Sequence, residues 1–205
     1  MYKLNMTRRA IGTVAIALLF ATAAQAQQPG RIRGQVEKVD GATYVLKARD
    51  GTTLNVKLAD DARVSALEKA SLADIKTDTF IGIAGMPKPD DSIEAFSVHI
   101  FLPAQRGVVP DRHGPWDARP NSTMTNGTVD QTVASVDGRV VIVKYKDGEK
   151  KIQVPPDARI LAYQAGDKSE LKPGALIAIV RAVKKPDGSL ETNRVNVGRG
   201  EVVPQ

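Results

Sequence analysis

The chain has no cysteine among its 205 residues, which excludes disulfide scaffolds, thiolate metal clusters, cysteine nucleophiles and a lipid anchor on cysteine. Aromatic residues make up only 4% of the sequence, too few for a surface that stacks nucleic-acid bases. The sequence also lacks Gly-x-Ser-x-Gly, His-Glu-x-x-His and a glycine-rich phosphate loop. With 42% hydrophobic residues it is still apolar enough to fold. We therefore expect a folded protein without a known catalytic motif.

Residues 1–26 have the features of a secretory signal peptide. They carry three basic residues and no acidic one, continue as an apolar run of about 15 residues, and end in Ala24-Gln25-Ala26. This run is shorter than the roughly 20 apolar residues of a membrane anchor. We expect cleavage after Ala26 and a periplasmic or secreted bacterial protein that is not an integral membrane protein.

The basic character of the chain comes partly from this leader. The formal net charge is +6, and removal of the three basic residues of the leader leaves +3. A charge of this size favours solubility but does not make the basic surface that binds nucleic acid. We expect no nucleic-acid partner, and an envelope protein or a small ligand instead.

The remaining sequence reads as two copies of one unit. Six short matches recur in the same order at a spacing of about 97 residues, from Val39-Asp40-Gly41 and Val136-Asp137-Gly138 to Val98-His99-Ile100 and Val195-Asn196-Val197. Six ordered matches at one spacing indicate duplication. The sequence predicts a first unit at 30–102, a proline-rich linker with Trp116 at 103–126, a second unit at 127–200 and a tail at 201–205.

Each unit shows the pattern of a small β-domain. In the first unit, the turns Asp40-Gly41 and Asp50-Gly51 separate three β-rich segments, and two more strands are expected at 80–85 and 93–101. Between these groups, Ser65-Ala66-Leu67-Glu68 has the spacing of a capping box and predicts a short helix that reaches Ile75. This order favours an all-β fold of two tandem five-stranded OB-like barrels, each with at most one short helix. An open meander or sandwich of the same strands is the alternative.

Two stretches of the second unit resemble a known family. Residues 171–179 and 186–195 are similar to the "L-K-x-G-x-x-V-x-V … D-G-x-L-x-A-x-x-V" pattern of the bacterial DUF5666 family, exported β-domains of unknown function. The first unit departs from this pattern, with Ile75-Lys76-Thr77-Asp78 where the glycine would be and Asp91 in place of the turn glycine. The resemblance implies an exported β-domain and assigns no activity.

The linker concentrates the candidate binding residues Asp111, Arg112, His113, Trp116 and Asp117. In one interpretation Trp116, the single tryptophan, packs against the barrel ends and fixes how the units sit, while the charged residues stay solvated. In the other, His113 with Asp111 and Asp117 binds a first-row metal ion, with His99 as a further ligand. His99 alternates with Val98 and Ile100, so we expect its side chain to face solvent.

These features favour an exported, non-catalytic binding or envelope-accessory module that carries no cofactor and no metal ion. A partner would contact the central strands of a barrel or the linker at Trp116. The first alternative is a periplasmic metal-binding protein that uses His113 and nearby aspartates. The second is a carbohydrate-active enzyme whose two carboxylates come from distant strands.

Overall fold

A computed structural model describes residues 31–135 and 138–204. The all-β prediction is confirmed: in these residues the only helices are the 3₁₀ turns Leu72–Asp74, Pro103–Gln105 and Lys168–Glu170. The expected signal peptide at 1–26 lies outside the described residues. The strands are β1 (Ile32–Asp40), β2 (Thr43–Ala48), β3 (Thr53–Lys69), β4 (Phe80–Pro87), β5 (Ile93–Ile100), β6 (Arg112–Pro115), β7 (Thr123–Ser135), β8 (Gly138–Tyr145), β9 (Gly148–Val154), β10 (Arg159–Ala165), β11 (Leu176–Ile179), β12 (Val183–Lys184) and β13 (Leu190–Gly198).

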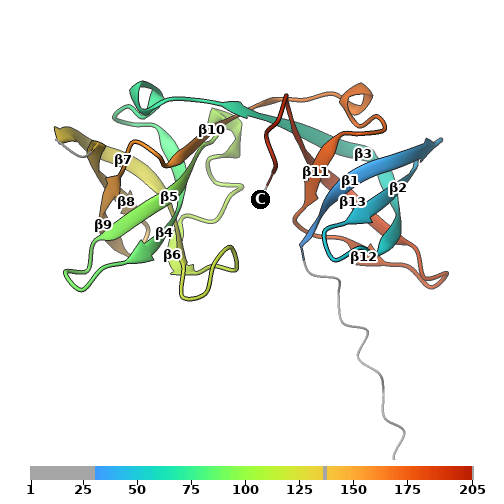
Figure 1. Cartoon of the computed structure of the whole chain (residues 1–205), viewed down its shortest axis with the longest axis horizontal. Helices are drawn as coiled ribbons and strands as arrows, with labels where there is room; N and C mark the ends of the chain where they lie inside the picture. The colour runs from blue at the N-terminus through green and yellow to red at the C-terminus, as the bar shows by residue number, and fades with distance from the viewer. Residues whose placement is uncertain (1–30, 136–137, 205) are drawn as a thin grey trace, which may run out of the picture.

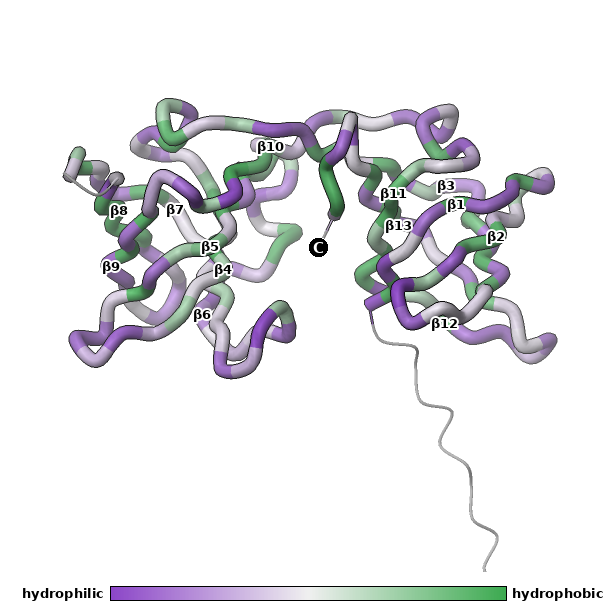
Figure 2. Tube along the Cα trace, in the orientation of Figure 1, coloured by the Kyte–Doolittle hydropathy of each residue, from purple (hydrophilic) through white to green (hydrophobic). Residues whose placement is uncertain are grey.

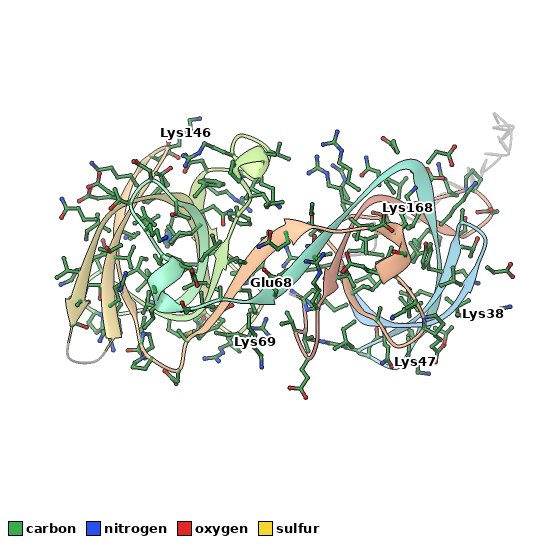
Figure 3. The ribbon with its side chains drawn as sticks, turned by 90° about the horizontal axis from the view of Figure 1, so that it is seen from above. Lys38, Lys47, Glu68, Lys69, Lys146 and Lys168 are labelled. Carbon is green, nitrogen blue, oxygen red and sulfur yellow. The ribbon has the colours of Figure 1, made fainter. Side chains whose placement is uncertain are left out.

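The strands form two lobes that are joined by two crossing strands (Figure 1). Lobe A contains β1, β2, β11, β12, β13 and the first part of β3, and lobe B contains β4 to β9. Strand β3 is 17 residues long and its end leaves lobe A, where β10 pairs with Ser65–Lys69 in the opposite direction. Leu67 and Tyr163 pair at the middle of this short ladder. Figure 3 looks down on the crossing, where Glu68 and Lys69 mark the end of β3.

Strand pairings link both lobes into one mixed sheet. In lobe A, β1 pairs with β2 and β11, β2 with β3, and β11 with β13, while a parallel contact between β13 and β3 completes the circuit. In lobe B, β7 pairs with β8 and β4, β8 with β9, and β4 with β5, while a parallel contact between β5 and β9 completes the circuit. The two lobes therefore use the same order of pairings.

Each lobe has its own hydrophobic cluster, seen as green stretches along its strands in Figure 2. The members of the lobe A cluster come from 32–66 and 171–197. The members of the lobe B cluster all lie between Ile75 and Ile160. A small third cluster of Leu67, Leu161 and Val202 lies at the crossing, so the tail at 201–204 packs between the lobes.

The chain boundaries of the lobes differ from those of the predicted units. The middle of the chain forms lobe B and the two flanking parts form lobe A, so the units 30–102 and 127–200 each give strands to both lobes. The finer expectation of two tandem barrels is not confirmed, because the sheet is continuous. The physical reason lies in β3 and β10, which cross to the other lobe instead of turning back.

The helix predicted from Ser65 to Ile75 is wrong. Residues 65–69 extend β3 and pair with β10, and only Leu72–Asp74 makes a single 3₁₀ turn. A capping interaction does form further along the chain. There, Asp74 Oδ2 accepts hydrogen bonds from the backbone N and the hydroxyl of Ser71 at 2.9 and 2.7 Å. Extended pairing on β3 satisfies the backbone groups that a helix would have satisfied internally.

Corresponding positions of the two predicted units occupy corresponding registers. Leu190 of β13 lies beside Val56 of β3, and Ile93 of β5 lies beside Ile152 of β9 in the same parallel contact. The first strands carry equivalent glycines as well. A Cβ on Gly34 would overlap the carbonyl oxygen of Lys47, and one on Gly127 would overlap that of Lys144. Each lobe therefore requires glycine where its first strand lies close to its second.

Candidate functional site

The candidate segment 111–117 is divided between the lobes. Its first part belongs to lobe B, where β6 pairs with Thr123–Asn126 of β7. Asp111 Oδ1 accepts a hydrogen bond from the backbone N of Lys146 at 3.2 Å, and Arg112 is exposed. Its second part, Trp116 and Asp117, contacts lobe A.

His113 lines a groove of about 410 Å³ on lobe B, together with Gly114, Pro115, Asn121, Ser122 and Thr123. Its Nδ1 lies 2.8 Å from Thr125 Oγ1. Burial lowers the pKa of His113, and the nearby Lys150 ammonium lowers it further against the weaker opposing effect of Asp91. The imidazole is therefore mostly neutral at pH 7 and offers its other ring nitrogen as a hydrogen-bonding group.

Trp116 and Asp117 contact two arginines at the start of β1, Arg31 and Arg33, which we call the arginine pair. The Arg31 guanidinium lies 4.0 Å above the centre of the Trp116 ring. A single oxygen, Asp117 Oδ1, accepts hydrogen bonds from Arg31 Nη1 at 3.2 Å and Arg33 Nη2 at 3.3 Å. The linker thus ties lobe B to the first strand of lobe A.

Positive charge exceeds negative charge at the arginine pair. The side chains of Arg31 and Arg33 are 14% and 18% exposed, whereas Asp117 is 59% exposed. Desolvation lowers the pKa of Arg31, Asp117 acts against this shift and Arg33 adds to it. Because both cations are largely covered and share one exposed carboxylate, the pair is only partly neutralised.

Several N–H groups around the arginine pair have no acceptor. Arg31 Nε, Arg33 Nε and Trp116 Nε1 are buried without a hydrogen-bond partner. All three atoms are donors only. An unsatisfied buried donor costs about 1–3 kcal/mol of folding free energy, so the three donors together destabilise this part of the folded protein.

His99 is buried beside this region, and the expectation that it faces solvent is wrong. His99 is only 5% exposed, and the ring of Tyr163, from the neighbouring strand β10, lies edge-on to it at 6.2 Å between ring centroids. Desolvation lowers the pKa of His99 to about 4, and Arg159 and Arg31 lower it in the same direction. Its Nε2 has no hydrogen-bond partner.

Tyr163 and Arg159 complete the region between the lobes. Desolvation raises the pKa of Tyr163 to about 12, and its hydroxyl accepts a long hydrogen bond of 3.4 Å from Asn196, the counterpart of His99 in the second unit. Arg159 Nη2 donates to the backbone oxygen of Val203 in the tail at 3.1 Å. Arg159 therefore anchors the tail to β10.

A second groove, of about 390 Å³, lies on lobe A where β3 bulges away from β13. Asp61 and Glu191 line it, together with Arg181 and Asn193. The Glu191 carboxylate is already paired with Lys185 at 2.8 Å.

The structure does not bring the expected metal ligands together. Asp111 binds the backbone of Lys146 and Asp117 binds the arginine pair, while His113 faces Thr125. In the part of the chain that the structure describes, no group of three His, Asp or Glu side chains is arranged for a metal ion.

Sequence reasoning missed Arg31, Arg33 and Arg159. A signal for the first two was present, since residues two apart in a strand share a face and Arg31 and Arg33 flank the first strand residue. Nothing in the sequence indicated that Arg159 would bind the tail, because that placement depends on the crossing of β10.

No family model matches the chain, and no curated protein or solved structure matches it either. Among the described residues, no helix has the length and apolar character needed to cross a bilayer.

Proposed function

We propose that each lobe is a five-stranded OB-like barrel, and that the two barrels arose by duplication of one unit with exchange of its halves. Three consecutive strands of one unit combine with the last two strands of the other, and the parallel contact between them completes the circuit of pairings in both lobes. The equivalent registers and the equivalent glycines Gly34 and Gly127 support this origin. The resemblance to the DUF5666 family belongs to the same proposal.

On this scaffold the protein acts as an exported, non-catalytic binding module of the bacterial envelope. Export rests on the leader pattern at 1–26. Binding rests on the shallow, open groove beside His113, whose volume is about 410 Å³. This groove is the single observation that carries the function. The partner that binds in this groove is an envelope protein, which places an extended segment along β6.

The lining of the groove suits binding better than catalysis. Of the residues that line it, His113 alone is titratable, and its Nδ1 is engaged by Thr125. General acid–base catalysis needs a second group that exchanges protons with the first or with the substrate. A hydrogen-bonding group is available for a partner, since the exposed Asn121 also lines the groove.

In-cell photo-crosslinking tests this function. A photoreactive amino acid is placed at Pro115, on the rim of the groove, and in a matched protein at Val133, which is 58% exposed on lobe B outside the groove lining. We expect one defined protein adduct from position 115 and none from position 133. Adding Gly114→Tyr should abolish the adduct by filling the groove, since a Cβ at Gly114 meets no atom within 4 Å. Identical adducts from both positions, or none from position 115, would contradict the proposal.

A further inference from the structure

We propose that the arginine pair is a binding site for a phosphate-type oxyanion, and that Asp117 occupies this site until a ligand displaces it. The site lies on lobe A at the start of β1, apart from the groove beside His113, and so goes beyond the function proposed above.

The hydrogen bonds of the pair are incomplete in a way that fits an oxyanion. Asp117 offers one oxygen to two guanidinium groups, and Arg33 uses Nη2 while its Nε on the same edge has no acceptor. That edge of a guanidinium forms two parallel hydrogen bonds with a phosphate or carboxylate. A tetrahedral oxyanion has enough oxygens to engage both guanidiniums in this way, whereas Asp117 does not.

The charges around the site favour the same class of ligand. Arg31 and Arg33 face a single carboxylate. A dianionic ligand neutralises these two cations better than one aspartate does. Phosphate is therefore preferred over a monoanion of the same size.

Asp117 is suited to act as a displaceable occupant. Its side chain is 59% exposed, and the hydrogen bonds it makes to the pair measure 3.2 and 3.3 Å, longer than a strong charge-assisted bond. A ligand can approach from the solvent side and exchange with the carboxylate without unfolding either lobe.

The only tryptophan of the chain reports on this site directly. Trp116 stacks under Arg31, next to Asp117, so displacement of Asp117 changes the surroundings of the indole. The experiment titrates the purified exported protein with inorganic phosphate and follows Trp116 fluorescence, at constant ionic strength set by sodium chloride. Parallel titrations use succinate, to distinguish a dicarboxylate from a phosphate.

We expect saturable binding of phosphate, with weaker binding of succinate. Asp117→Asn removes the internal competitor and should tighten phosphate binding about tenfold, and Arg33→Gln should weaken it by about the same factor. Arg63→Gln is the matched control, because it removes the same charge from an exposed position on β3 and should leave the affinity unchanged.

Three results would overturn the proposal. In the first, Asp117→Asn and Arg33→Gln bind phosphate with the wild-type affinity. In the second, chloride alone reproduces the fluorescence change. In the third, succinate binds more tightly than phosphate, which would exclude a phosphate-type ligand. Asp117→Asn alters an exposed side chain, so the test stands even where Arg33→Gln does not fold.

Discussion

His99 makes the stability of this protein depend on pH. The residue is buried on β5, beside the paired strand β10, with Arg159 and Arg31 near enough to oppose its protonation. Because its pKa is about 4 in the folded protein and about 6.5 in the unfolded chain, only the unfolded chain takes up the proton between these values. The contribution of His99 to stability is therefore intact above pH 6.5 and is lost as the pH falls toward 4.

Replacement of His99 tests this directly. Between pH 7.5 and pH 5 the wild-type protein should lose about 2 kcal/mol of unfolding free energy through this residue. His99→Asn should remove that part of the pH dependence, since the second unit carries Asn196 at the corresponding position and the amide does not titrate. Urea unfolding at the two pH values measures the difference.

His113→Asn serves as the comparison, because His113 is less buried and its pKa is also lowered. It should keep most of the wild-type pH dependence. If His99→Asn and the wild-type protein lose the same unfolding free energy on acidification, the buried environment assigned to His99 is incorrect.

At the scale of the element, the close approach of each first strand to its neighbour depends on glycine. Gly127 is buried in β7, and a methyl group there would overlap the carbonyl oxygen of Lys144 in β8. Gly127→Ala should therefore destabilise the protein by about 2 kcal/mol, because a backbone group has to move. The midpoint of urea unfolding reports this change.

Gly114→Ala is the matched control in the neighbouring strand β6, where a methyl group meets no atom within 4 Å. It should change the unfolding free energy by less than about 0.5 kcal/mol. Equal effects of the two alanines would show that β7 and β8 do not approach each other as described.

Strand β3 shows how far sequence patterns determine the elements. Alternation in Leu54–Leu58 and the turn Asp50-Gly51 correctly predicted its first part. The pattern of its second part, with a capping-box spacing at Ser65 and Glu68, favoured a helix. Pairing with β10 and β13 outweighs that local preference, and such pairing depends on residues about a hundred positions away.

Only the part of the candidate site that lies on the linker was predictable from the sequence. The unusual composition of the linker identified Asp111, Arg112, His113, Trp116 and Asp117. Their contacts could not be derived from the sequence, because only the folding of the two lobes places His113 beside Thr125 and Asp117 beside the arginine pair.

At the scale of the whole molecule, the proposed exchange of halves is the feature on which the account depends. Tandem and exchanged arrangements of a duplicated unit use the same strand interfaces, so the sequence pattern fits both. The length of β3 and its antiparallel pairing with β10 favour the exchanged form. In a tandem form each of these two strands would turn back into its own unit, whereas here they pair with each other. Each lobe then holds strands from both sides of the linker.

Cleavage of the linker tests this arrangement most directly. A recognition sequence for a site-specific protease is inserted after Gly107, which is exposed and whose Cβ position is open. After cleavage of the folded protein, the two pieces should elute together in size-exclusion chromatography under native conditions, at the volume of the uncut chain, and separate only in denaturant. Pieces that separate in native buffer would show that each predicted unit folds around its own core, and would contradict the exchange.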